Sequence, residues 1–184
     1  MSGLPGSGKT RLALALAGHG MARLCPDEEM FRRNGRRGVD FPRSEYLIRE
    51  RLVLDELAVQ LHRLLTAGKD AVLDHGLWTR EERSEWRTLV EDAGTVPMLV
   101  YLPVPHEVRW PRIQARNRRA TTDPAEFDEE DLLRYANRFR APSDDEPHLI
   151  YDGHPESVLG SLGYGDTPPA SRATYGAIPG SPKP

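Results

Sequence analysis

The sequence contains little cysteine and has no long apolar run. Cys25 is its single cysteine, which excludes a disulfide scaffold and a zinc site built from cysteines. The longest apolar stretches, residues 12–17 and 98–102, are far shorter than the roughly 20 residues of a membrane-spanning helix. The N-terminus also lacks a signal-peptide pattern. We therefore expect a cytoplasmic protein with no membrane partner.

The chain also lacks a strong excess of charge of either sign. Its formal net charge is −3, from 25 basic and 28 acidic side chains. Tight non-specific binding to nucleic acid needs many phosphate-neutralising cations, and this composition disfavours it. Lysine is rare, with only Lys9, Lys69 and Lys183 in the chain, so a lysine inside a motif is informative.

A change of composition near residue 153 indicates one folded domain followed by a tail. Residues 154–184 number 31, of which 11 are Gly or Pro, and few of the others are apolar. Such a segment cannot offset the entropy lost on ordering, so we expect it to be disordered. The predicted domain covers residues 1–153, long enough to bury a core.

Helical and strand patterns alternate within residues 9–153, which predicts an α/β domain with a parallel sheet. The predicted helices cover residues 10–18, 28–33, 44–66, 79–93, 106–118 and 128–139. The predicted strands cover residues 21–25, 71–73, 96–102 and 148–151. Residues 96–102 are apolar throughout, as is typical of a strand buried on both faces, and Thr79 and Glu82 have the spacing of a helix capping box.

The strongest motif is a phosphate loop that fits G-x-x-x-x-G-K-[ST] at every fixed position. Its residues are Gly3, Leu4, Pro5, Gly6, Ser7, Gly8, Lys9 and Thr10. Glycines let backbone N–H groups face an anion, and the helix that follows adds its positive N-terminal end. Lys9 would reach the β- and γ-phosphates, and Thr10 would place its hydroxyl on Mg²⁺. A chance glycine turn before a helix is the alternative, which the number of matched positions disfavours.

The phosphate loop has an unusual position, because only Met1 and Ser2 precede it. A loop of this kind normally follows a buried strand in the centre of the sheet. We therefore expect the first strand to be missing from the chain as given. A start codon further upstream is our preferred explanation, and a truncated or damaged domain is the alternative.

Several classes of phosphate-loop protein are excluded by motifs that the sequence lacks. No Asn-Lys pair occurs, so the N-K-x-D motif by which GTPases read the base is absent. The signature loop of ABC ATPases is also absent. AAA+ machines usually carry Asp-Glu after an apolar strand, whereas Asp74 is followed by His75. A small kinase remains.

The order of the motifs resembles a bacterial family of small ATP-binding, kinase-like proteins related to zeta toxin, chloramphenicol phosphotransferase and polynucleotide 5′-hydroxyl kinase. The resemblance spans nearly all of residues 1–153 and rests on the phosphate loop, Asp27, residues 73–80, Arg112, Arg116, Asn117, residues 139–142 and Glu146. It implies a three-layer, nucleoside-kinase-like parallel sheet with a lid, and ATP and Mg²⁺ as cofactors.

Two acids are candidates for the chemistry. The resemblance implies that an acid at the tip of the second strand takes up or orients the acceptor's hydroxyl proton, and Asp27 matches it. Strand C-termini converge on the ligand crevice in such sheets, which supports this role, but Asp27 could instead cap helix 28–33. Asp74 ends the next strand and is the candidate acid on the Mg²⁺ side, through water; a turn or cap role stays open.

The candidate lid contains Arg112 and Arg116, which share a helix face with Arg119. The resemblance implies that such arginines close over the phosphates and stabilise the transferred charge. We rank Arg116 first and Arg112 second. A stripe that contacts nucleic acid is the alternative, and the neighbouring acids argue against it.

Three further features are weaker. Arg80 and Arg83 lie among glutamates and read as a solvated face. Trp78 is expected to pack beneath the next helix rather than to line an acceptor pocket. Residues 33–38 form a basic loop that hints at an anionic acceptor, although a solvated loop is commoner.

Together these observations predict a phosphotransferase that moves the γ-phosphate of Mg-ATP to a hydroxyl of a small molecule. Asp27, Lys9 and Arg116 would be its catalytic residues, and ATP rather than GTP is what the family implies. A polynucleotide 5′-hydroxyl is the alternative acceptor. An ATP-binding regulator without transfer activity is the alternative from another class.

Overall fold

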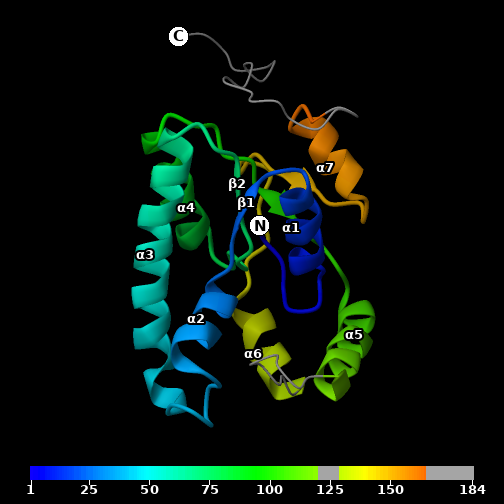
Figure 1. Cartoon of the computed structure of the whole chain (residues 1–184). Helices are drawn as coiled ribbons and strands as arrows, with labels where there is room; N and C mark the ends of the chain where they lie inside the picture. Colours follow the sequence, from blue (N-terminus) through cyan, green and yellow to red (C-terminus); the bar gives the residue numbers. More distant parts are fainter. Residues whose placement is uncertain (120–128, 165–184) are drawn as a thin grey trace.

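The computed structural model describes residues 1–119 and 129–164, and Figure 1 shows its elements in chain order. The described helices are α1 (Lys9–Gly18), α2 (Pro26–Asn34), α3 (Tyr46–Thr66), α4 (Arg80–Asp92), α5 (His106–Arg119), α6 (Glu129–Arg138) and α7 (Pro155–Ser161), with a 3₁₀ turn η1 (Arg43–Glu45) before α3. The described strands are β1 (Ala22–Leu24), β2 (Ala71–Leu73), β3 (Val100–Tyr101) and β4 (Leu149–Ile150). Among these helices, none is long and apolar enough to cross a membrane.

The described strands form two parallel pairs. β1 pairs with β2, with Ala22 opposite Ala71, and β3 pairs with β4, with Val100 opposite Leu149. The parallel arrangement predicted from the alternating pattern is therefore confirmed. Parallel strands place their carboxyl ends at one edge, which is where a ligand site is expected.

Residues 1 and 2 lie where the first strand was expected, between the two pairs. The N–H of Ser2 donates to the carbonyl oxygen of Val100 at 2.8 Å, and the N–H of Leu102 donates to that of Ser2 at 2.9 Å. On the other side, the Ser2 hydroxyl donates to the carbonyl oxygen of Leu77 at 2.9 Å. A bridge between Ser2 and Tyr101 thus stands in the place of a full strand.

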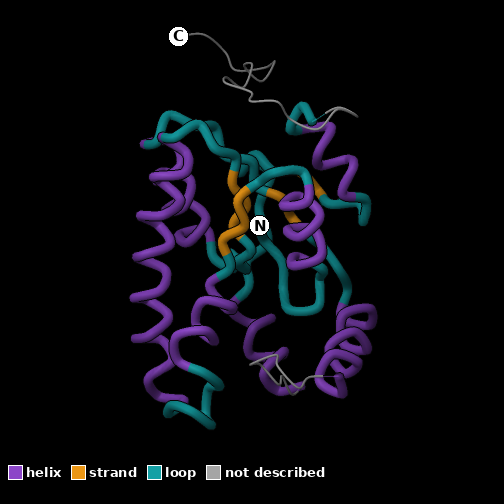
Figure 2. The backbone as a smooth tube through the Cα atoms, in the orientation of Figure 1, coloured by secondary structure: helices purple, strands orange, loops and turns teal. Residues whose placement is uncertain are grey.

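The helices cover the strands on two sides, which gives three layers (Figures 1 and 2). On one side, α1 and α7 pack over the strands, and their buried residues include Leu12, Leu16 and Val158. On the other side, α2 and α3 form a second cluster, and α4 packs against it. Leu57 and Leu61 of α3 are buried there, whereas Leu47 is exposed and lines the cleft described below.

The predicted boundary at residue 153 needs correction. Residues 155–161 form α7, and its Val158 and Leu159 are 0% and 6% exposed in the core beside α1. An apolar pair within a Gly- and Pro-rich segment is enough to attach one short helix to the core. The folded part therefore extends at least to Tyr164, and the rest of the predicted tail, 165–184, lies outside the described residues.

The predicted strand 96–102 is also too long. Only Val100–Tyr101 is strand, and Val96 and Met98 are exposed. Pro97 has no N–H to donate to a neighbouring strand, which explains why pairing begins after it. Residue 128 of the predicted helix 128–139 falls outside the described residues, and α6 begins at Glu129.

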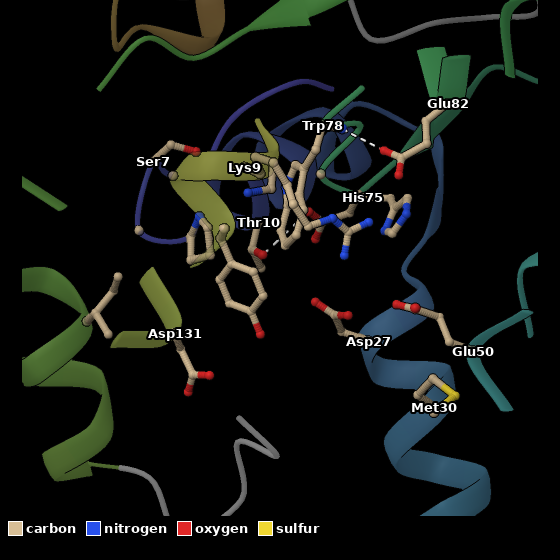
Figure 3. Close-up of a pocket in the computed structure, with 18 of the residues that line it drawn as sticks. Ser7, Lys9, Thr10, Asp27, Met30, Glu50, His75, Trp78, Glu82 and Asp131 are labelled. Carbon is tan, nitrogen blue, oxygen red and sulfur yellow. Dashed lines mark hydrogen bonds between the residues drawn. The ribbon is translucent and has the colours of Figure 1, made fainter. Parts of the chain in front are cut away.

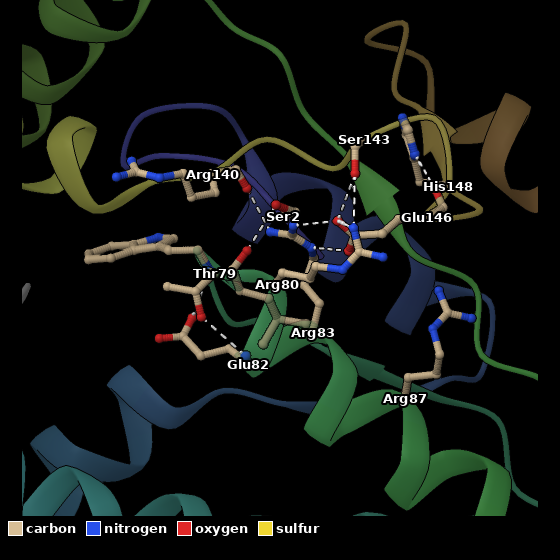
Figure 4. A network of polar contacts seen from close by, with 12 residues as sticks. Ser2, Thr79, Arg80, Glu82, Arg83, Arg87, Arg140, Ser143, Glu146 and His148 are labelled. Carbon is tan, nitrogen blue, oxygen red and sulfur yellow. Dashed lines mark hydrogen bonds and ion pairs between the residues drawn. The ribbon is translucent and has the colours of Figure 1, made fainter.

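The solvated face predicted for α4 is wrong at Arg83. This side chain is buried, and its guanidinium binds both carboxylate oxygens of Glu146, at 2.7 and 2.8 Å, and the carbonyl oxygen of Arg140 at 2.7 Å (Figure 4). Arg80 pairs with Asp145 at 2.6 Å beside it. These contacts hold the segment between α6 and β4 against the start of α4. By contrast, the predicted capping box of Thr79 and Glu82 is confirmed.

Candidate active site

A large cleft lies at the carboxyl ends of β1 and β2, and the close-up in Figure 3 shows residues that line it. Its volume is about 1670 Å³, above the roughly 300–1,000 Å³ typical of a site for one small ligand. The cleft therefore has room for two ligands side by side. Its walls include nearly all the predicted site residues: Pro5, Gly6, Ser7, Gly8, Lys9, Thr10, Asp27, Asp74, Arg112 and Arg116.

The phosphate loop has the backbone geometry that an anion cradle needs. Gly6 and Gly8 have φ angles of 80° and 101°, in the left-handed region that favours glycine. A Cβ on Gly6 would lie only 3.0 Å from the carbonyl oxygen of Arg109 and 3.1 Å from Ile113. Gly8 leads directly into α1, whose N-terminal N–H groups then face the cleft. Gly3 and Leu4, the first residues of the loop, do not line the cleft.

Two side chains of the loop have polar atoms suited to phosphate. The Lys9 ammonium donates to the carbonyl oxygens of Gly3 and Leu4, at 2.8 and 3.1 Å. The Ser7 hydroxyl is buried and has no hydrogen-bond partner within the described part of the chain. A buried polar atom without a partner is costly, and a phosphate oxygen would satisfy it. The loop therefore fits the phosphates of a nucleotide.

Burial lowers the pKa of Lys9 to about 8, although the negative charge of Asp74 acts in the opposite direction. Arg116 and Arg109 also lower this pKa, so both guanidinium groups lie within electrostatic reach of the ammonium. Positive charge thus accumulates at the phosphate loop before any anion is bound.

Asp74 is buried at the end of β2 and has two different neighbours. Its Oδ1 accepts a hydrogen bond from the Thr10 hydroxyl at 3.4 Å, and its Oδ2 binds the guanidinium of Arg23 at 2.6 and 3.0 Å. Arg23 also binds Glu28 at 2.8 Å. Sequence reasoning missed Arg23, although an arginine within the apolar strand β1 was a signal.

The oxygens of Thr10 and Asp74 suit Mg²⁺, which prefers oxygen ligands and keeps several waters. The described residues contain no group of three or more His, Cys, Asp or Glu side chains that could enclose a metal by themselves. The two oxygens therefore fit a Mg²⁺ ion held mainly by nucleotide phosphates and water. Thr10 would be its direct ligand, and Asp74 would contact it through water.

Asp27 lies in the first turn of α2 and its carboxylate projects into the cleft (Figure 3). The helix is capped at Cys25 and continues through Pro26, so Asp27 is already inside it. The alternative role of Asp27 as an N-cap is therefore wrong. Glu28 points to Arg23 instead, and Asp27 is the acid of this turn that lines the cleft.

Glu50 of α3 is a second acid near Asp27 that sequence reasoning missed (Figure 3). Burial raises its pKa, and the charge of Asp27 raises it further. The Tyr46 hydroxyl donates to Glu50 Oε1 at 3.1 Å. No sequence signal marked Glu50, because it sits among the charged residues of a long amphipathic helix.

Aromatic side chains form part of the cleft wall. The ring centroids of Trp78 and Tyr135 are 4.7 Å apart, and both residues line the cleft. Trp78 was expected to pack beneath α4, so this expectation is corrected. His75 lies nearby, and burial lowers its pKa to about 4, which keeps the imidazole neutral near pH 7.

The candidate lid arginines of α5 reach the phosphate loop. Arg112 donates to the carbonyl oxygen of Gly6 at 3.3 Å, and Arg116 lines the cleft one turn further on. Arg109 is buried and donates to the carbonyl oxygens of Val104 and Pro5. Arg109 therefore supports the phosphate loop. The sequence did not indicate this role, because Arg109 is one of several arginines in the same helix. The side chain of Arg119 lies outside the described part.

This fold and this cleft define an α/β phosphate-loop protein. The chain belongs to the AAA_33 family, described as an AAA domain, which it matches over residues 1–142. Asp74-His75 nevertheless differs from the Asp-Glu pair that is usual in AAA+ machines. Among curated proteins, none matches the chain.

Two solved structures have a similar fold. A candidate kinase from Chloroflexus aurantiacus superposes with a TM-score of 0.66 at 20% identity, and covers 88% of this chain and 93% of its own. A sugar kinase from Janibacter sp. superposes with a TM-score of 0.56, also at 20% identity, over 89% of this chain and 90% of its own. The resemblance to small phosphate-loop kinases is therefore confirmed at the level of fold and family.

Proposed function

We propose that the protein transfers the γ-phosphate of Mg-ATP to a hydroxyl group of a small molecule. The observation that carries this proposal is the single cleft in which the phosphate loop, Asp27 and the arginines of α5 meet. Phosphoryl transfer depends mainly on positioning and on charge neutralisation, and these groups supply both.

The phosphate loop and α5 bind the donor. Backbone N–H groups of Gly6 and Gly8 and the Ser7 hydroxyl hold phosphate oxygens, and Lys9 leaves its two loop carbonyls to reach the β- and γ-phosphates. Arg112 and Arg116 approach from the other side and stabilise the charge that develops on the transferred group. Bound Mg²⁺ would neutralise phosphate charge beside Thr10 and Asp74.

Asp27 addresses the acceptor. Its carboxylate accepts the proton of the acceptor hydroxyl while the acceptor oxygen forms a bond to the γ-phosphorus. The bond from that phosphorus to the bridging oxygen breaks, and ADP leaves with the bonding electrons. The part of the cleft that Trp78, Tyr135 and Glu50 line holds the remainder of the acceptor.

The test is transfer of labelled γ-phosphate from Mg-ATP to a panel of nucleosides, sugars, antibiotic alcohols and 5′-hydroxyl oligonucleotides. Asp27→Asn should abolish product while nucleotide binding persists. Glu29→Gln, on the same helix but outside the cleft, is the matched control and should retain activity. A preference for oligonucleotide ends with steep salt dependence would favour the polynucleotide alternative. ATP binding without transfer to any acceptor would favour a regulator.

A further inference from the structure

Two arginines that line the cleft lie on aromatic rings. Arg37 belongs to the loop between α2 and η1, and its guanidinium carbon is 4.8 Å from the ring centre of Tyr46. Arg138 ends α6, and its guanidinium carbon is 5.6 Å from the ring centre of Trp78. Both arginines line the same cleft as Asp27.

The two arginines are connected through Tyr135. This tyrosine packs against Trp78, with 4.7 Å between ring centres, and its hydroxyl is within hydrogen-bonding reach of Arg37. Tyr46, Arg37, Tyr135, Trp78 and Arg138 thus form one continuous arginine–aromatic strip. The strip joins three segments that are distant in the sequence, so it exists only in the folded chain.

The two guanidinium groups of this strip form no ion pair at contact distance within the described part of the chain, although Glu50 lies within electrostatic reach of Arg138. Neighbouring groups already have partners: Glu82 accepts the N–H groups of Trp78 and Thr79, Asp131 pairs with Arg134, Asp40 pairs with Arg36, and Glu50 accepts from Tyr46. Among the described residues, neither Arg37 nor Arg138 has a carboxylate within ion-pair distance.

A guanidinium stacked on a ring is restricted in orientation but keeps its N–H edge available. Its planar donors match the oxygens of phosphate and carboxylate groups, often in pairs. Two such guanidinium groups lie in the same cleft as Asp27, the acid that we assign to the acceptor hydroxyl. They therefore form a recognition site for an anionic group of the acceptor.

We propose that the acceptor carries an anionic oxyacid group, phosphate or carboxylate, in addition to the hydroxyl that is phosphorylated, and that Arg37 and Arg138 bind this group. The inference rests on the proposed kinase function and names the class of acceptor. A solvated basic loop, the commoner origin of such arginines, would not require both side chains to sit on rings within one cleft.

The first test measures anion binding without any acceptor. Inorganic phosphate is titrated calorimetrically into the full chain after the phosphate loop has been saturated with Mg²⁺ and a non-hydrolysable ATP analogue. We expect Arg37→Met and Arg138→Met each to weaken phosphate binding by about 10-fold or more, because a charged hydrogen bond is lost.

The control is Arg32→Met, which replaces an exposed α2 arginine outside the cleft and should bind phosphate as the wild type does. Unchanged nucleotide affinity shows that each variant is folded. Phosphate binding that is absent, or equal in all four proteins, overturns the inference.

The second test separates the inference from the proposed function. It compares acceptors in two series, and the members of each series share one carbon skeleton. The first series is glucose, gluconate and glucose 6-phosphate, and the second is adenosine and adenosine 5′-monophosphate. We expect the protein to prefer the anionic acceptors, and the comparison of gluconate with glucose 6-phosphate shows whether carboxylate or phosphate is bound better. In Arg37→Met and Arg138→Met this preference should be lost because KM for the anionic acceptors rises. Transfer that favours the uncharged members refutes the anionic acceptor and leaves the kinase intact. If no acceptor is phosphorylated but phosphate binding still depends on the two arginines, the kinase function is refuted and the anion site is retained.

Discussion

Arg23 binds Asp74 through two nitrogens, at 2.6 and 3.0 Å, and leaves the other carboxylate oxygen to Thr10. The side chains are 13% and 2% exposed, so this is a pair formed away from water. The arginine orients the acid that we place beside Mg²⁺ and compensates its buried charge. Arg23 is thus a positioning residue.

Replacing Arg23 by methionine should destabilise the protein by about 3–5 kcal/mol, because it leaves the buried Asp74 carboxylate without its hydrogen-bonded counter-charge. Urea unfolding measures this loss. The Mg²⁺ concentration for half-maximal activity should also rise, which a purely structural role would not produce. Arg32→Met, which removes an exposed arginine outside the cleft, is the control, and an unchanged Mg²⁺ dependence in Arg23→Met would contradict the positioning role.

Nucleotide affinity should decrease as the pH rises above about 8, the pKa to which burial lowers Lys9. Below this value the lysine is charged and attracts phosphate; above it, binding must be accompanied by proton uptake. Calorimetry with a non-hydrolysable ATP analogue at pH 7 and pH 9, in two buffers of different ionisation enthalpy, measures both effects. Lys9→Met should bind weakly at both pH values, and a wild-type affinity that does not change with pH would exclude this assignment.

The same shift has a consequence for stability. The pKa of Lys9 in the folded protein is below its ordinary value of 10.5, so folding opposes its protonation. The free protein should therefore become more stable relative to Lys9→Met as pH rises from 8 to 10.5, since the wild type no longer buries a charge. Thermal unfolding across this range compares the two proteins.

The buried pair of Arg83 and Glu146 should contribute to stability without affecting nucleotide binding. Arg83→Met leaves Glu146 with only the exposed Arg80 at 4.0 Å as a cationic neighbour, and we expect a loss of about 3–5 kcal/mol in urea unfolding. Arg83 lowers the pKa of Glu146 below its ordinary 4.5, so the pair's contribution is complete above that pH and is lost as the pH falls through the lowered value. The double variant Arg83→Met/Glu146→Leu should recover much of the loss. A single variant as stable as the wild type would show that the pair is solvated after all.

Helix α7 should behave as part of the folded domain. Leu159→Ala removes a side chain that is 6% exposed, and we expect a loss of about 2–5 kcal/mol. Leu133→Ala, at a position that is 58% exposed, should change stability little. Equal unfolding curves for the two variants would instead support the boundary at residue 153.

Local signals predicted the elements well where a motif was complete. The phosphate loop, strand β2 and the Thr79–Glu82 capping box each depend on residues close together in the sequence, and each appears where expected. The parallel pairing followed from the alternation of helices and strands.

The errors arose where the partner is distant. Arg83 shares a helix with four glutamates, but its partner is Glu146, 63 residues away, and no periodicity distinguishes such a pair from a solvated face. Glu50 acquires its raised pKa only when α3 packs beside α2. Helix α7 was missed because the Gly- and Pro-rich composition of the tail outweighed Val158 and Leu159. These two residues are buried by contact with α1, which is distant in the sequence.

The position of Arg109 has a mechanical consequence for α5. Its guanidinium joins the base of this helix to Pro5 and Val104, so the base moves together with the phosphate loop. Pro111 follows inside the helix and has no N–H to bond to the preceding turn. The helix is thus anchored at one end and weakened just beyond the anchor. A bend at Pro111 would therefore carry Arg116 away from the cleft only if Arg112 and Ile113, which still contact Gly6, released the loop.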